Sequence, residues 1–250
     1  MRQVWSNLKA RVGNKLARHL RVSPAKLNNS RPMVSFTFDD APISAATRGA
    51  AMLEEYNARA TFYIAGGLVD GWSGHWTGVS AEHIVGLHRA GHEIACHTFS
   101  HARATELSET AMAAELEKNR RYLQGLDPSI RIENFAYPYG TGSVLRKRQL
   151  GRAFHSSRGI LPGVNRGAVD LQYLRAFPLI EGQIGRDGID RAFDEAVAGN
   201  GWLIFYGHDV EATPSPYGCS PELLRHALEA AARRKVAALH VADALRFAGA

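Results

Sequence analysis

The chain has 250 residues, 45% of them hydrophobic and 22% charged, which is enough to bury one sizeable core. No apolar run reaches the length of about 18 residues that a membrane-spanning helix needs. The two cysteines are too few for a disulfide framework, and the N-terminus has no apolar secretory core. We therefore expect a reduced, cytoplasmic protein.

The positive charge is concentrated at one end of the chain. The first 21 residues hold six of the 30 bases and no acid, so the remainder has as many bases as acids and the formal net charge of +6 lies in this segment. Because the rest of the chain is balanced and shows no basic stripe, we predict that the protein does not bind nucleic acid.

The basic segment also has a helical pattern. Its apolar residues recur at steps of three and four: Val4, Trp5, Leu8, Val12, Leu16 and Leu20. We predict a basic amphipathic helix over residues 1–21 and a linker up to residue 31, ahead of a single domain over 32–250. The helix either lies on an anionic membrane face, at the inner membrane, or packs on the domain or a partner subunit. A disordered segment is the third alternative.

From residue 33 onward, short apolar runs alternate with helical patterns. The predicted strands cover 33–38, 60–65, 92–96, 133–137, 153–156, 202–206 and 236–240. The predicted helices cover 47–56, 80–89, 108–124, 186–198 and a segment starting at 220. Such alternation indicates an α/β protein with a parallel sheet and helices outside. About seven repeats suit a closed or nearly closed barrel better than a small open sheet.

Two adjacent carboxylates, Asp39 and Asp40, follow the strand predicted at 33–38. Consecutive side chains of an extended chain point in different directions, so one can bind a metal while the other faces a substrate. The alternative is a surface turn or a helix start, for which Asp-Asp-Ala-Pro is equally suitable.

Two histidines, His97 and His101, follow the strand predicted at 92–96. A spacing of four places both on one side of a helical turn or tight loop. The chain holds 11 histidines, so an unrelated pair is the alternative on spacing alone. Together with the aspartate pair, however, these residues favour a hydrolytic metal site, since His and Asp are ligands that suit zinc.

Four polar residues come just after apolar runs, at the expected C-terminal ends of strands: Asp39, His97, Tyr139 and His208. In parallel α/β architectures the active site forms at those ends. We therefore expect these residues to converge on one site.

Four ordered motifs resemble those of the polysaccharide deacetylases (NodB homology domain, carbohydrate esterase family 4). They are Thr-Phe-Asp-Asp at 37–40, His-Thr-Phe-Ser-His at 97–101, Phe-Ala-Tyr-Pro-Tyr-Gly at 135–140 and Leu-Ile-Phe-Tyr-Gly-His at 203–208. The similarity runs from about residue 33 to the end of the chain, and the two histidines are its most specific part. The resemblance implies a distorted (β/α)7 barrel of the NodB-homology type and metal-dependent removal of an acyl group, usually acetyl from a sugar.

The resemblance also implies a role for each matching residue. Asp39 matches the general base and His208 the general acid, and Tyr139 matches the residue whose backbone N–H helps to bind the oxyanion. The implied ligands of the divalent metal are Asp40, His97 and His101. The metal expected is Zn2+, with Co2+ and Mn2+ as alternatives.

Two departures from the family pattern concern the residues that support the base and the acid. Ala136 stands where an arginine often steadies the base, and we predict that Arg175 supplies this guanidinium, with Arg158 as the alternative. The aspartate that often orients the acid histidine has no clear match, and Asp170 and Asp209 are the candidates.

The sequence therefore predicts a carbohydrate deacetylase, a hydrolase acting on a linear amide. Its expected substrate is an N-acetylated sugar or a precursor of a cell-surface glycan, which a lipid could carry. The same site would also suit an O-acetyl esterase or a sugar deformylase, and a non-catalytic glycan-binding member of the fold is the alternative from another class. Trp72 and Trp76 lie among glycines, where they either contact sugar rings or plug the rim of the barrel.

Overall fold

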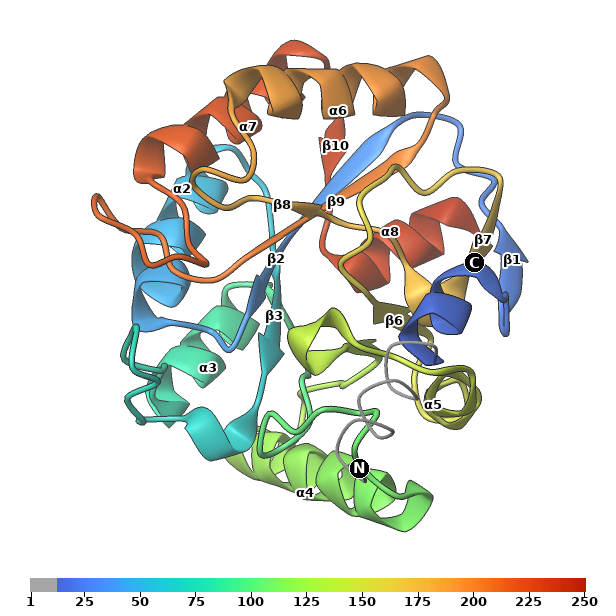
Figure 1. The fold of residues 1–250 in the computed structure, drawn as a ribbon. Helices are drawn as coiled ribbons and strands as arrows, with labels where there is room; N and C mark the ends of the chain where they lie inside the picture. Colours follow the sequence, from blue (N-terminus) through green and yellow to red (C-terminus); the bar gives the residue numbers. More distant parts are fainter. Residues whose placement is uncertain (1–12) are drawn as a thin grey trace.

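The computed structural model describes residues 13–250, and a curled parallel sheet lies at its centre (Figure 1). The strand order within this part of the chain is β6-β5-β4-β3-β2-β9-β8, and short β10 (Ala237–Ala238) pairs with the beginning of β2. The strands are β2 (Met33–Asp39), β3 (Thr61–Ile64), β4 (Glu93–Cys96), β5 (Asn134–Ala136), β6 (Ser156–Arg158), β8 (Phe177–Pro178) and β9 (Trp202–Gly207). All of these pairings are parallel, as the sequence predicted.

Helices surround the sheet on its outer side (Figure 1). They are α2 (Ala50–Glu55), α3 (Ala81–Arg89), α4 (Glu109–Leu126), α5 (Val144–Leu150), α6 (Arg186–Ala198), α7 (Pro221–Arg233) and α8 (Val241–Ala248). Short helical turns are η1 (Ala45–Gly49), η2 (Gly66–Leu68), η3 (Pro138–Gly140) and η4 (Leu171–Tyr173). Serine hydroxyls accept a backbone N–H at the starts of α3, α4, α5 and α7, which satisfies a donor that the helix itself leaves unpaired.

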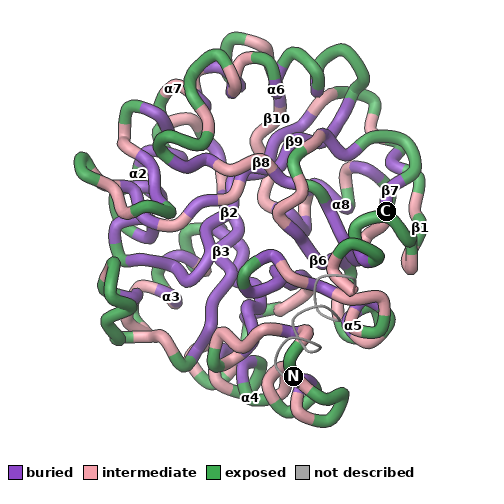
Figure 2. Tube along the Cα trace, viewed as in Figure 1, coloured by how far each residue is buried: buried purple, intermediate pink, exposed green. Residues whose placement is uncertain are grey.

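The buried strands form the centre of the core (Figure 2). Every residue of β2 is buried, because this strand lies between β3 and β9 and is covered on both faces. Phe36 stacks on Phe205 at 5.8 Å between ring centroids, and Phe38 stacks on Phe62 at 5.3 Å. This aromatic layer fixes β2, and so fixes the two aspartates at its end.

The barrel is open between β6 and β8, and residues 159–176 fill the gap. Leu174 pairs with Arg158 in an isolated parallel bridge, and the N–H of Ala176 donates to the carbonyl of Leu161. The sheet is therefore a half-barrel whose missing wall is built from irregular chain. β7 (Ala168–Asp170) belongs to this wall and pairs antiparallel with β1 (Pro24–Lys26), so part of the predicted linker is a strand.

Some predicted elements differ from those in the structure. The strand predicted at 153–156 is β6 at Ser156–Arg158, because the turn after α5 occupies residues 151–153. The strand predicted at 236–240 is reduced to β10, because His240 already caps α8 with its ring nitrogen. A helix was expected between the strands at 133–137 and 153–156 without bounds, where α5 lies, and α8 was not predicted.

The predicted N-terminal helix lies partly outside the described residues. Residues 13–19 are helical and pack beside α5, whereas residues 1–12 are not described. Within residues 13–250, no helix is both long enough and apolar enough to span a bilayer.

Candidate active site

The predicted site residues meet at the C-terminal ends of neighbouring strands. Asp39 is the last residue of β2, His97 follows β4 and His208 follows β9. Because these strands are parallel, their ends lie at one edge of the sheet. Tyr139 lies in η3, directly beyond β5. The structure therefore brings these four residues to the same edge.

Asp40, His97 and His101 form a compact group of potential metal ligands. One ligand atom from each lies within 4.8 Å of the others. Oδ1 of Asp40 is 3.7 Å from Nε2 of His97 and 3.4 Å from Nε2 of His101. Nδ1 of His97 donates to the carbonyl of Ala136 at 2.9 Å, which leaves Nε2 with its lone pair facing the group.

The chemistry of this group fits a divalent cation. Oδ1 of Asp40 is buried and has no hydrogen-bond partner among residues 13–250. Burial and the neighbouring charge of Asp39 raise the pKa of Asp40 to about 7. Burial lowers the pKa of His97 to about 4, and burial with the charge of His97 lowers the pKa of His101 to about 3. Neutral imidazoles beside an unpartnered carboxylate are the donor set that a metal ion completes.

Asp39, the predicted base, forms a buried ion pair with Arg158. Nη2 of Arg158 donates to Oδ1 of Asp39, and the two side chains are 0% and 7% exposed. Burial alone would raise the pKa of Asp39, but the charge and hydrogen bond of Arg158, together with the charges of His97 and His208, outweigh it and hold the pKa below its ordinary value. The carboxylate is therefore ionised and held in one orientation.

The expectation that Arg175 supports the base was wrong, and Arg158 is the residue that does so. Ala136 on β5 is directly paired with Arg158 on β6. The guanidinium therefore reaches Asp39 from β6, the strand next to β5, where the family pattern often places the arginine. Ala136 is small and fully buried, which leaves room for the longer side chain beside it. Arg175 is exposed, and its Nη1 donates to the carbonyl of Pro162.

Arg158 also contacts two tyrosine rings. Its guanidinium carbon lies 5.0 Å from the ring centroid of Tyr63 and 5.3 Å from that of Tyr206, within the range of a cation–π interaction. These contacts help to stabilise the charged side chain of Arg158 in a fully buried position. Sequence reasoning did not identify Tyr63, whose position on β3 beside Asp39 follows only from the strand register.

His208, the predicted acid, is oriented by a backbone carbonyl. Its Nδ1 donates to the carbonyl of Tyr217 at 3.2 Å, and the ring of Trp76 lies 5.1 Å away between centroids. Burial lowers the pKa of His208, partly offset by the charge of Asp39. Trp76 thus packs against the acid at the rim, whereas Trp72 is 70% exposed.

Neither of the two aspartates considered for orienting His208 accepts a hydrogen bond from its ring. Asp170 forms a buried ion pair with Lys147 at 2.5 Å. Asp209 accepts hydrogen bonds from the backbone N–H and the hydroxyl of Ser215 at 2.8 and 2.5 Å. Asp209 therefore shapes the loop that carries the carbonyl of Tyr217.

Tyr139 lies against the predicted metal ligands with a strained backbone. Its φ is 58°, in the left-handed region that tyrosine rarely adopts, and the same holds for Asp40 and His101 at 59° and 56°. The ring of Tyr139 lies 4.5 Å from that of His101, and the guanidinium of Arg103 lies 3.7 Å from its centroid. Such strain persists where surrounding contacts enforce it, and it is common at functional sites.

Comparison with known proteins agrees with the fold. A bifunctional xylanase/deacetylase of Pseudobutyrivibrio xylanivorans is 27% identical over 110 residues, which cover 44% of this chain and 17% of that protein. Three solved structures share the fold at low identity. The chitin deacetylase of Colletotrichum lindemuthianum has a TM-score of 0.64 and 16% identity, covering 87% of this chain and 89% of that one.

The other two structures are bacterial. An acetyl xylan esterase of Clostridium thermocellum, in complex with a cobalt ion, has a TM-score of 0.61 and 20% identity, covering 87% of this chain and 92% of that one. The peptidoglycan deacetylase PdaC of Bacillus subtilis has a TM-score of 0.60 and 16% identity, with the same coverage. These likenesses confirm the expected NodB-type fold. The family model for polysaccharide deacetylase matches residues 26–153, just over half of the chain, and this protein therefore belongs to the polysaccharide deacetylase family.

Proposed function

We propose that the protein is a metal-dependent hydrolase that removes the N-acetyl group from a sugar. The observation that supports this proposal is that two adjacent carboxylates have pKa values shifted in opposite directions. Asp39 is held ionised by Arg158, whereas Asp40 has a raised pKa and faces two neutral histidines. An ionised base beside a set of metal ligands is what hydrolysis of an amide by an activated water requires.

The metal that we propose is zinc, with cobalt or manganese as alternatives, held by Asp40, His97 and His101. A divalent ion bound there would lower the pKa of a water towards ~7 and polarise the acyl oxygen of the substrate. The residues around it then have separate tasks, which follow from their protonation and position.

Asp39 accepts the proton of the attacking water, because its carboxylate is ionised and oriented by Arg158. His208 donates a proton to the leaving nitrogen, and its lowered pKa makes the protonated ring a stronger acid. We assign the backbone N–H of Tyr139 to the developing oxyanion, where one such donor is worth about 3 kcal/mol. The resulting products are a free amine on the sugar and acetate.

The substrate that we propose is an N-acetylated sugar or cell-surface glycan precursor, carried on a lipid and met at the cytoplasmic face of the membrane. Support for a sugar comes from the rim, where Trp76 and Tyr217 both lie beside His208, with ring centroids 5.1 and 5.8 Å from it. Aromatic faces of this kind pack well on the apolar face of a sugar ring. The exposed ring of Trp72 would extend that surface.

A substrate panel tests this proposal and separates it from its alternatives. Purified protein is incubated with N-acetylated, O-acetylated and N-formylated sugars, free and lipid-linked, and the released acetate and formate are quantified. We expect acetate from the N-acetylated compounds. Faster release from the O-acetylated or N-formylated compounds would indicate an esterase or a deformylase, and tight glycan binding without any release would indicate a non-catalytic member of the fold.

A further inference from the structure

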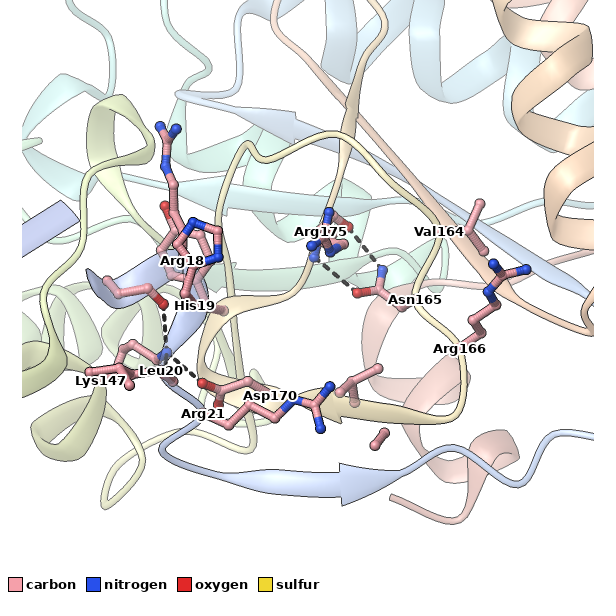
Figure 3. A pocket seen from close by; sticks show the side chains of 14 residues that line it. Arg18, His19, Leu20, Arg21, Lys147, Val164, Asn165, Arg166, Asp170 and Arg175 are labelled. Atoms are coloured by element: carbon pink, nitrogen blue, oxygen red, sulfur yellow. Dashed lines mark hydrogen bonds and ion pairs between the residues drawn. The ribbon is translucent and has the colours of Figure 1, made fainter. Parts of the chain in front are cut away.

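A cavity of about 280 Å³ lies away from the proposed catalytic residues (Figure 3). Its walls come from residues 17–21, from Lys147 on α5 and from the segment 164–175 that fills the open side of the half-barrel. Asp39, Asp40, His97, His101 and His208 do not line it. The cavity therefore belongs to a part of the molecule that the hydrolytic reaction does not use.

Four arginines from two stretches of chain line this cavity: Arg18 and Arg21 from residues 17–21, and Arg166 and Arg175 from residues 164–175. All four are exposed, and none lies within 4.0 Å of a carboxylate oxygen among residues 13–250. Residues 1–12 contain no aspartate or glutamate, so the segment that is not described adds no acid. The arginines are therefore available to an external anion.

Among the described residues of the wall, the one acid is already neutralised. Asp170 pairs with Lys147 at 2.5 Å, and its two oxygens also accept the backbone N–H groups of Val22 and Ser23 at 2.9 and 3.0 Å. Lys147 is 1% exposed and also donates to the carbonyls of Ala17 and Leu20. This buried pair fixes the end of the N-terminal helix in place and leaves the four arginine charges uncompensated.

The chemistry of the wall suits an oxyanion such as a phosphate. Arginine presents a planar fork of donors that matches the oxygens of phosphate, and several guanidiniums around one cavity can share one dianion or diester. Two large apolar side chains lie on the same segment as Arg18 and Arg21, and both are exposed, Leu16 at 46% and Leu20 at 50%. Exposed leucines beside arginines are typical of a surface that meets both the headgroups and the acyl chains of a bilayer.

We propose that this cavity binds the phosphate of an anionic phospholipid headgroup and holds the enzyme on the bilayer surface. Tyr173 connects the cavity to the catalytic edge, because it lines the cavity and its hydroxyl donates to the carbonyl of Gly140, next to Tyr139. The site is distinct from the hydrolytic one, so its test uses binding and not turnover.

The test compares two double variants that lose the same charge. Arg166→Gln/Arg175→Gln removes two arginines of the cavity, and Arg89→Gln/Arg121→Gln removes two exposed arginines on α3 and α4. Each protein is sedimented with phosphatidylcholine vesicles that contain or lack phosphatidylglycerol. We expect wild-type protein to bind only the anionic vesicles, and the cavity variant to bind them about 30-fold more weakly, since each base near the surface contributes about fivefold.

The control variant should keep at least most of the wild-type binding. Equal weakening of the two variants would overturn the proposal, because it would show attraction to net charge and not to the cavity. A second experiment titrates the wild-type protein and the cavity variant with inorganic phosphate. A third measures binding of Leu16→Ala/Leu20→Ala to the anionic vesicles. We expect the leucine variant to bind vesicles more weakly. Phosphate binding that depends on Arg166 and Arg175, without any binding of wild-type protein to vesicles, would overturn the lipid assignment in favour of a soluble phosphate.

Discussion

Arg158 donates a hydrogen bond from Nη2 to Oδ1 of Asp39 from a position directly beside Ala136 on the neighbouring strand. The guanidinium thus reaches the carboxylate from β6, although the family pattern often places it on β5. A buried carboxylate needs such a partner, because an unpaired charge at this depth is strongly unfavourable. The contact between an arginine and the carboxylate is therefore present, but the arginine comes from a different strand.

Replacing Arg158 by alanine should impair both stability and catalysis. Asp39 would remain buried without its partner, so we expect a loss of about 3–5 kcal/mol in the free energy of unfolding and a higher pKa for the base. Denaturant titration and the kcat/KM for acetate release measure the two effects. Arg152→Ala, at a side chain 78% exposed, is the matched control and should change neither.

Moving the arginine back to β5 provides a sharper test of the same contact. In the double variant Ala136→Arg/Arg158→Ala the guanidinium starts from the paired position on the adjacent strand. We expect it to recover a measurable part of the activity that Arg158→Ala loses, with a pH–rate profile closer to that of the wild type. An inactive but folded double variant would show that the position of Arg158, and not only its charge, is required.

Asp40→Asn should abolish metal binding while leaving the fold intact. The change removes the charged ligand and leaves two neutral histidines, which hold a divalent ion weakly. Metal content after dialysis is measured by elemental mass spectrometry, and Asp243→Asn on α8 is the control. A chelator should lower the Tm of wild-type protein, since a ligand bound only to the native state stabilises it, and should leave the Tm of Asp40→Asn unchanged.

Asp209→Ala should reduce turnover without loss of metal. The carboxylate holds Ser215, and the loop up to Tyr217 provides the carbonyl that orients His208. A less ordered loop leaves the acid free to rotate, so we expect kcat to fall by about 10-fold or more, within the range that general acid catalysis contributes. Unchanged kcat would mean that the carbonyl of Tyr217 does not need this support.

Glu93 lies at the other end of the sheet, at the start of β4. We expect it to make the stability of the protein depend on pH. Its carboxylate accepts from Thr61, from Asn134 and from the N–H of Ala242 at 2.8, 2.6 and 3.0 Å. Burial alone would raise its pKa, but hydrogen bonds from His240 and Asn134 hold it below the ordinary value of 4.5.

A depressed folded-state pKa stabilises the protein above pH 4.5, and this stabilisation is lost as the pH falls through the folded value. Glu93→Gln should therefore lower the free energy of unfolding by about 2–3 kcal/mol at neutral pH, and by less below pH 4.5. Denaturant titrations at several pH values measure this difference. A difference that stays constant with pH would contradict it, and Glu106→Gln, at a side chain 68% exposed, is the control.

The parts of the site that were predictable are those that local sequence encodes. Asp39, Asp40, His97 and His101 follow apolar runs directly, so the strand-end position and the ligand types were visible together. Arg158 was predicted only as the alternative to Arg175, because the predicted strand ended at 156, and the contact with Asp39 depends on which residues of β5 and β6 are paired.

The contact that orients His208 was hidden for a different reason. Its partner is the backbone carbonyl of Tyr217, and a carbonyl leaves no signature in the sequence. The irregular wall between β6 and β8 was not predicted either. Its order comes from hydrogen bonds between distant segments, such as Leu174 with Ser157, and not from a periodic pattern of apolar residues.

We propose that Asp39 acts as base next to a metal held by Asp40 and the two histidines. The most direct measurement is acetate release from the best substrate by wild-type protein and by Asp39→Asn, each with its metal content determined. We expect one divalent ion per chain in both proteins, and a rate at least ~100-fold lower in the variant. Undiminished release by Asp39→Asn, or by metal-free wild-type protein, would contradict this mechanism.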